Sequence, residues 1–328
     1  MADLTTTYAG VPMRNPVVVG ACSISGMIDN IKRAEDAGAG ALVIRSLFEE
    51  QINFESLELD EALKVGSESF GESLYYFPPL KHGGSREHLM WVEKTRKAVK
   101  MPLFGSLNAV SPGKWVSYAK ELEGTGVDGL ELNVYAVQTD PARNCGEVEK
   151  SLYAIVEQVK SQVKIPITVK LSPYYSSVAH VARELDRRGV KGLVLFNRFL
   201  QPDIDAGTES LRLEMDYSQS RESRLPLRWM AVLYGQVKCD LAASSGIHDS
   251  EDAIKQLLAG ATVVQVASTL YTHGIEYIRS ILGGVEKWMD ARGYRGVSDF
   301  RGKLSQKKVS DPFLFERAQY VRILTSAP

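Results

Sequence analysis

The chain has little cysteine and no excess of charge of either sign. Only three of its 328 residues are cysteines, Cys22, Cys145 and Cys239, with no CxxC pair and no metal-ligand spacing. This argues against structural zinc and an iron–sulfur cluster, and it favours a reducing compartment. The formal net charge of −1 leaves no overall positive field to attract nucleic acid. The histidines stand singly, so no metal site is expected.

Long apolar runs are also missing. No stretch reaches the roughly 18 uninterrupted apolar residues of a membrane span, and the first residues lack the pattern of a signal peptide. We therefore expect a cytoplasmic protein that acts on a small molecule and has no nucleic-acid or membrane partner. A length of 328 residues suits one large α/β domain covering residues 1–328.

Short apolar runs alternate with helical patterns along the chain, which is typical of a parallel sheet. A small β-hairpin is expected first, with strands at Thr5–Tyr8 and Val11–Met13 around Ala9-Gly10. Eight apolar runs then predict a (β/α)₈ TIM barrel, with strands at Val17–Ala21, Ala41–Arg45, Pro102–Leu107, Gly129–Val134, Ile167–Lys170, Gly192–Asn197, Val237–Ala243 and Thr262–Ala267. Long insertions are expected after the second and sixth of these strands, in residues 46–100 and 198–235.

The last two predicted strands both end in small residues. One is followed by Ser245-Gly246 and the other ends at Ala267-Ser268, where unobstructed N–H groups can approach a phosphate closely. In TIM barrels, the loops after the last two strands commonly form a phosphate site. The simpler alternative is that both are ordinary tight turns, and two such turns in succession favour phosphate.

The carboxyl ends of the other predicted strands carry amides, one lysine and one arginine. Barrel enzymes build their sites at these ends. The residues there are Gly20, Ala21, Cys22, Arg45, Ser46, Asn108, Asn133, Lys170 and Asn197. They contain no carboxylate pair for acid–base chemistry, whereas amides and a buried ammonium suit a flat, polar heterocycle. Alternatively, Arg45 pairs with Glu49 or Glu50, and the two later asparagines form turns.

Several segments together resemble the class 1 dihydroorotate dehydrogenases, which are FMN-dependent (β/α)₈ flavoproteins. The resemblance rests on NPVVVGA (15–21), AGAGALVIRS (37–46), LELNV (130–134), VKLSPYY (169–175), VLFN (194–197), SSGI (244–247), GATVVQVAST (260–269) and GYRGVSDFRGKLS (293–305). These segments occur in the family's order over nearly the whole chain.

The resemblance implies a role for each candidate residue. Lys170 would contact the flavin ring, Asn133 and Asn197 would face both ring and substrate, and Asn108 would also lie at the cofactor. Gly20, Ala21, Cys22 and Ser46 would contact the isoalloxazine, and Arg228 falls where the family has a glycine-rich flavin contact. The phosphate would lie against Ser245, Gly246, Ala267 and Ser268.

The substrate half departs from the family pattern. The family's Cys or Ser general base, three residues after an Asn, corresponds to Ala136, which cannot accept a proton. The nearest ionisable neighbour is Tyr135, and the family's lysine after the second strand is Arg45. Arg198 replaces a serine near the substrate. The catalytic candidates are therefore Lys170, Tyr135 and Arg45. The flavin-binding residues of the family pattern are kept, whereas the pyrimidine-binding residues are largely replaced.

We therefore expect an FMN-dependent oxidoreductase that transfers hydride between a small, pyrimidine-like substrate and flavin, with dihydroorotate itself doubtful. The resemblance also implies a homodimer. Two alternatives stay open. One is a lyase or aldolase that forms a Schiff base on Lys170 in the same barrel, and the other is a flavin-binding protein without turnover.

Overall fold

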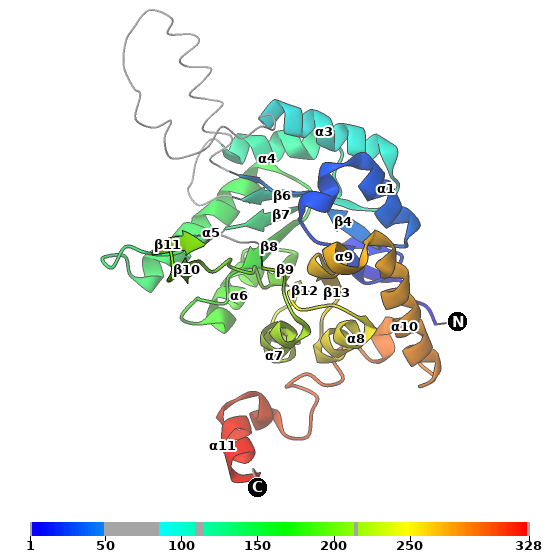
Figure 1. Ribbon diagram of the computed structural model, residues 1–328, viewed down its shortest axis with the longest axis vertical. Coiled ribbons are helices and arrows are strands. Elements are labelled where there is room, and N and C mark those ends of the chain that lie inside the picture. The colour runs from blue at the N-terminus through cyan, green and yellow to red at the C-terminus, as the bar shows by residue number, and fades with distance from the viewer. Residues whose placement is uncertain (1, 49–84, 109–114, 135, 213–215, 327–328) are drawn as a thin grey trace, which may run out of the picture.

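The computed structural model describes residues 2–48, 85–108, 115–134, 136–212 and 216–326 (Figure 1). Most of the expected first insertion lies outside the described residues, and so does Tyr135.

Eight parallel strands close into a barrel. They are β3 (Val17–Val19), β4 (Ala41–Val43), β6 (Leu103–Asn108), β7 (Gly129–Asn133), β8 (Ile167–Leu171), β9 (Gly192–Leu195), β12 (Asp240–Ser244) and β13 (Val263–Val266). The order is β4-β3-β13-β12-β9-β8-β7-β6, and β4 also pairs with β6, which closes the circle. A short strand, β5 (Leu47–Phe48), extends the pairing at the end of β6. The predicted TIM barrel is confirmed.

Helices surround the barrel (Figure 1). They are α1 (Ile28–Asp36), α3 (Ser85–Ala98), α4 (Trp115–Gly124), α5 (Cys145–Gln162), α6 (Val178–Arg187), α7 (Arg224–Leu233), α8 (Ser250–Ala259), α9 (Ser268–His273) and α10 (Ile278–Asp290). Local signals set their ends. Asn144 and Glu147 form a capping box at the start of α5, and the Asp249 side chain caps α8 by accepting a hydrogen bond from the Asp252 N–H.

The apolar interior has two parts. The larger cluster lies between the barrel and the helices, as expected for strands that are buried on both faces. The smaller cluster fills the barrel itself and contains Tyr8, Ala9 and Met13 together with strand residues such as Phe104 and Val263. These first three residues belong to the N-terminal hairpin, which therefore plugs the amino-terminal end of the barrel.

The hairpin itself was predicted correctly. Strands β1 (Thr6–Tyr8) and β2 (Val11–Met13) pair antiparallel, and the two residues between them have positive φ, 54° at Ala9 and 84° at Gly10. Such a two-residue turn matches the twist of the strands. The Ala9 N–H donates to the Asp240 carboxylate over 2.8 Å, which ties the hairpin to the start of β12.

The region between the sixth and seventh barrel strands differs from the expectation of a long loop. It contains a hairpin of β10 (Asp203–Asp205) and β11 (Ser210–Arg212), followed by helix α7, and the seventh strand begins at Asp240 rather than Val237. Pro226 makes α7 hard to predict from the sequence, because proline usually interrupts a helix. It is the third residue of α7, where the N–H has no acceptor within the helix, so proline is tolerated there.

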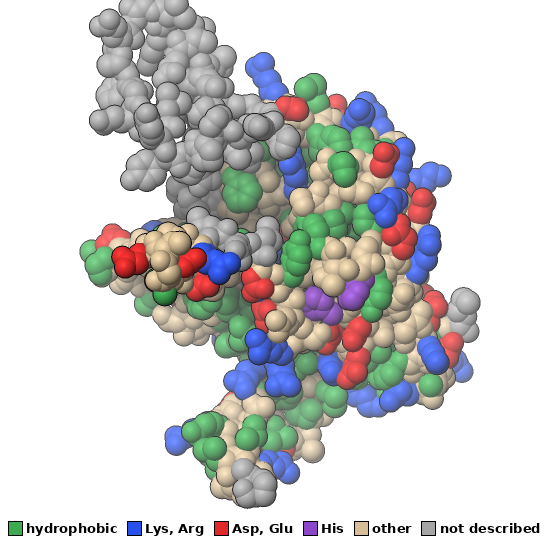
Figure 2. Space-filling view, in the orientation of Figure 1, with side chains coloured by type: hydrophobic (Ala, Val, Ile, Leu, Met, Phe, Trp, Pro, Cys, Tyr) green, Lys and Arg blue, Asp and Glu red, His purple; other side chains and the backbone are tan. Residues whose placement is uncertain are grey.

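The chain ends in helix α11 (Arg317–Ser326), which projects from the barrel at the bottom of Figure 1. Figure 2 shows hydrophobic side chains on this projection, and Tyr320, Ile323 and Leu324 are each more than half exposed. Over the part of the chain that the structure describes, no helix combines the length and apolar character needed to cross a bilayer.

Candidate active site at the mouth of the barrel

Polar side chains line the carboxyl end of the barrel interior. Phe104 and Val263 belong to the interior cluster, and side chains on a strand alternate, so Ser106, Asn108 and Gln265 also face inward. Neighbouring strands continue these layers, because Asn133 pairs in register with both Asn108 and Lys170. The interior is thus apolar near the hairpin and polar at the mouth.

A carboxylate and an amide meet across the lumen. Gln265 Nε2 donates to Glu131 Oε2 over 2.6 Å, although β13 and β7 stand on opposite sides of the barrel. The other oxygen, Glu131 Oε1, lies 3.9 Å from Lys170 Nζ. The Lys170 side chain is 11% exposed, so its ammonium reaches the mouth from an almost buried position.

The expected amides are brought together. Asn197 Nδ2 donates to Asn133 Oδ1 over 3.0 Å. Nearby on the wall, the hydroxyls of Ser46 and Ser106 are 2.7 Å apart, and Asn108 is buried. Amides and hydroxyls both donate and accept, so this wall can match the edge of a heterocycle that carries carbonyl and N–H groups.

The end of β3 contributes main chain and a thiol. The Gly20 N–H donates to the Val266 carbonyl, which joins β3 to β13, and Ala21 and Cys22 follow at the mouth. Burial raises the pKa of the Cys22 thiol. The Tyr271 hydroxyl accepts from the Ser23 N–H over 2.9 Å. This tyrosine therefore covers the end of β3.

The two small-residue turns lie beside each other, with Ser218 between them. The Gly246 N–H donates to Ser218 Oγ over 3.3 Å, and the Ser218 N–H donates to Ser268 Oγ over 3.2 Å. Ser245 and Gly246 have φ of 77° and 72°, and a Cβ on Gly246 would lie 2.3 Å from the Ser223 nitrogen. The glycine is therefore required by close backbone packing. Ala267 directly precedes α9.

The three candidate arginines lie in different settings. The main-chain carbonyl of Arg45 accepts from His88 Nε2, and its main-chain N–H donates to Ser25 Oγ. The alternative in which the Arg45 side chain pairs with Glu49 or Glu50 involves residues outside the described ones. Arg198 forms ion pairs with Asp216 at 2.7 Å and Glu222 at 2.8 Å.

These ion pairs turn the Arg198 guanidinium toward the segment before α7 and away from the expected substrate role. The resemblance implied Arg228 at a flavin contact, and in the structure this residue is on helix α7. Arg228 is exposed on α7 and bonds Gln319 of α11, and Ser218 is the residue that bonds to both turns.

Four contributors to the mouth were missed in the sequence: Glu131, Gln265, Ser218 and Tyr271. Glu131 carried a signal, since a charged residue inside the apolar run LELN must face either a partner or the lumen. Ser218 and Tyr271 had none, because their roles depend on which loops meet in the fold.

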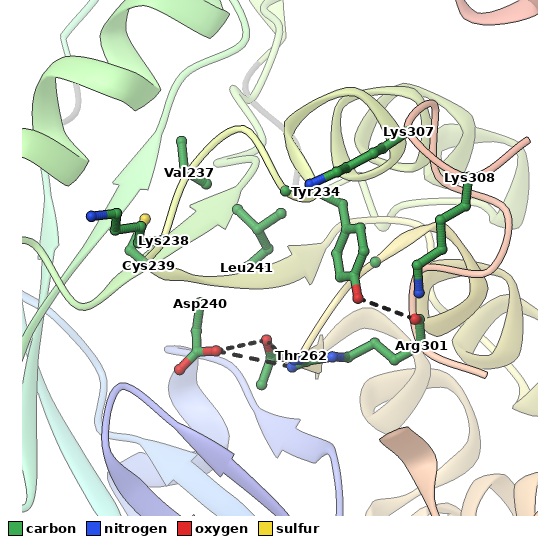
Figure 3. Close-up of a pocket in the computed structure, with 12 residues that line it drawn as sticks. Tyr234, Val237, Lys238, Cys239, Asp240, Leu241, Thr262, Arg301, Lys307 and Lys308 are labelled. Carbon is green, nitrogen blue, oxygen red and sulfur yellow. Dashed lines mark hydrogen bonds and ion pairs between the residues drawn. The ribbon is translucent and has the colours of Figure 1, made fainter. Parts of the chain in front are cut away.

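The other end of the barrel has a pocket of about 430 Å³. In Figure 3, Asp240, Thr262 and Arg301 bond one another on its floor, and the Tyr234 hydroxyl donates to the Arg301 carbonyl. The polar groups on this floor are engaged with each other. The convergent polar groups of the mouth make that end the candidate active site.

Comparison with known proteins agrees with this architecture. The sequence model of the family described as "Dihydroorotate dehydrogenase" matches residues 80–289. A protein of Aeropyrum pernix, provisionally named dihydroorotate dehydrogenase A (fumarate), is 29% identical over 227 residues, which cover 68% of this chain and 74% of that protein.

Two relatives match nearly end to end. The catalytic subunit of dihydroorotate dehydrogenase B (NAD(+)) of Thermoplasma acidophilum is 25% identical over 311 residues, covering 92% of this chain and 99% of that protein. The subunit of the same name from Methanothermobacter thermautotrophicus is 25% identical over 312 residues, with 91% and 97% coverage.

The family match covers more than half of the chain and decides between the flavoenzyme and the Schiff-base lyase in favour of the flavoenzyme. Enzymes of this family use FMN and act on CH–CH groups. The chain therefore belongs to the dihydroorotate dehydrogenase family of FMN-dependent oxidoreductases.

Proposed function

We propose that the mouth of the barrel holds FMN and a small pyrimidine-like substrate, in a single barrel domain formed by residues 1–328. The chemistry of the donors supports this, and the observation that carries the proposal is the convergence of Lys170, Asn133 and Asn197 at one end of the lumen. Bound FMN supplies the hydride-transfer centre for oxidation or reduction of a carbon–carbon bond.

The side chains of the wall would hold the ring. The Lys170 ammonium would stabilise negative charge on the ring, since a preformed positive charge in a poorly solvated site favours the charged state. Asn133 and Asn197 would orient ring and substrate, with Asn108, Ser46, Gly20, Ala21 and Cys22 around them. Tyr135 and Arg45 stay proposed catalytic neighbours.

The phosphate end would lie on the two turns. The Gly246 N–H and the hydroxyls of Ser218 and Ser268 form a group of weak hydrogen bonds, at 3.2 and 3.3 Å, that a phosphate oxygen can replace with shorter ones. Ser245 and Ala267 complete the turns. Ser218 joins the two turns here, whereas Arg228, which the resemblance implied at a flavin contact, bonds Gln319 of α11.

Ser268→Asp tests this placement. A carboxylate about 4 Å from a phosphate charge is repelled by about 4 kcal/mol at an effective dielectric of about 20. FMN affinity should therefore fall about a thousandfold, as measured by fluorescence titration of the apoprotein. Ser210→Asp on the exposed strand β11 is the matched control. Equal FMN affinity in both variants would place the phosphate elsewhere.

We further propose that dihydroorotate is a poor substrate. A positioned general base contributes about 10²–10⁴-fold to such an oxidation, and Ala136 offers none. The two carboxylates already paired with Arg198 compete with a substrate for its donors. The test is stopped-flow bleaching of the flavin by dihydroorotate beside a panel of related dihydropyrimidines. Rapid bleaching by dihydroorotate itself would contradict this proposal. If no compound bleaches the flavin, the alternative of flavin binding without turnover is favoured.

We also propose a cytoplasmic homodimer. The three free cysteines support a reducing compartment. An isolated helix as short as α11 is marginally stable in water, and its exposed Tyr320, Ile323 and Leu324 favour packing on a second copy. Light scattering should report a dimer that Ile323→Asp weakens, and cell fractionation should place the protein in the cytoplasm.

A further inference from the structure

Glu131 is a buried carboxylate that the proposed chemistry does not use. It is 1% exposed and lies in the layer of inward-facing residues just below Asn133 and Lys170. Its two oxygens differ: Oε2 accepts the 2.6 Å hydrogen bond from Gln265, and Oε1 has no hydrogen-bond partner among the described residues.

The unpartnered oxygen faces the lysine of the mouth. Lys170 Nζ lies 3.9 Å from Oε1, which is too long for a hydrogen bond but within the range of an ion pair. No hydrogen bond from Nζ is found within the described parts of the chain. The attraction is therefore Coulombic, and the ammonium keeps donors for a ligand at the mouth.

Among the residues that the structure describes, the next layer toward the hairpin offers Glu131 no positive charge. Tyr8 and Phe104 lie there, and burial, followed by the charge of Glu131, raises the pKa of the Tyr8 hydroxyl. A buried carboxylate is costly unless paired, and Lys170 is the cation beside it. The Gln265 amide fixes the carboxylate by one oxygen and keeps the other directed to the lysine.

We propose that Glu131, held by Gln265 across the lumen, is the positioning residue for Lys170. It holds the ammonium at the mouth and partly offsets its positive charge, and so sets the reduction potential of the bound flavin. This inference rests on the proposed contact of Lys170 with FMN.

The first test is Glu131→Gln, which keeps the shape and a hydrogen bond to Gln265 but removes the charge. With its charge no longer offset, Lys170 should favour the reduced flavin over the oxidised flavin at least tenfold more strongly. For a two-electron couple, tenfold corresponds to a shift of about 30 mV toward positive potential. Glu157→Gln, which breaks an ion pair with Arg188 on the outside of the barrel, is the matched control and should not shift the potential.

Gln265→Met gives a result of opposite sign. Freed from the amide, the carboxylate can close the 3.9 Å gap to Lys170, and the potential should fall. This variant keeps the inference testable if Glu131→Gln does not fold. A purely structural role for the Glu131–Gln265 bond predicts loss of stability in both variants without opposite shifts of potential.

A double-mutant cycle shows whether Glu131 acts through Lys170. Lys170→Met should itself change the potential and the FMN dissociation constant of the apoprotein, and in that background Glu131→Gln should no longer shift the potential. An undiminished effect there, or no shift in the single variant, would overturn the inference. If Lys170→Met alone changes neither quantity, the proposed flavin contact fails instead, so the two failures are distinguishable.

Discussion

His88 should make the protein less stable in mild acid. This side chain of α3 is 4% exposed and joins two parts of the structure: Nδ1 lies 2.7 Å from the Tyr118 hydroxyl and Nε2 lies 3.2 Å from the Arg45 carbonyl. A carbonyl only accepts, so Nε2 carries the hydrogen and Nδ1 accepts from the tyrosine. The neutral ring thus satisfies both contacts, whereas a proton on Nδ1 would place a positive charge in this buried site and require the Tyr118 hydroxyl to accept instead of donate.

The magnitude follows from the pKa. Burial lowers the pKa of His88 from 6.5 to about 4, and the charge of Arg45 adds to this. Between these two values the unfolded chain binds a proton that the folded chain does not, so stability is lost as pH falls from about 6.5 to about 4. A difference of about 2.5, at about 1.4 kcal/mol per pKa unit, gives about 3 kcal/mol in total.

Denaturant unfolding of the wild type and His88→Gln at a series of pH values measures the pH-dependent contribution of His88 to the free energy of unfolding. Gln does not titrate, so the stability advantage of the wild type over the variant should shrink by about 3 kcal/mol from neutral pH to about pH 4. His180→Gln, at an exposed histidine, is the control and should follow the wild type. Parallel pH profiles for wild type and His88→Gln would refute the reasoning.

Three further outcomes are expected. Gly40→Ala should destabilise the fold by about 1–3 kcal/mol in urea unfolding, because its Cβ would lie 2.1 Å from the Asn15 carbonyl oxygen. Gly283→Ala in α10, where the space around the new Cβ is open, should instead stabilise the fold by up to about 1 kcal/mol. Arg198→Ser removes two partly exposed ion pairs, so it should lower the free energy of unfolding by about 1 kcal/mol. It should also weaken FMN binding, because the segment that carries Ser218 is held less firmly. Unchanged FMN affinity would show that the ion pairs do not support the cofactor site. Ala136→Cys should not by itself restore dihydroorotate oxidation in stopped-flow measurements, because the other substrate contacts of the family pattern are also replaced, and a fast reaction would show that the base alone was missing.

The sequence determined the barrel because its signals are local. Strands buried on both faces require continuous apolar runs such as Val17–Val19, and helix ends require caps such as Asn144 and Asp249. The Ala9-Gly10 pair between two short strand-like runs made the hairpin recognisable. The alternation of strands and helices then places every strand end at one mouth, so Lys170, Asn133 and Asn197 could be grouped before any coordinates.

Only the tertiary structure decided which side chains meet. Glu131 and Gln265 are 134 positions apart, and their bond exists because barrel closure brings β7 and β13 to face each other across the lumen. Arg198 pairs with Asp216 and Glu222 because the segment between the β10–β11 hairpin and α7 lies beside it. Periodicity carries the direction of a side chain relative to its own strand, whereas its partner depends on closure of the whole sheet and on the paths of its loops.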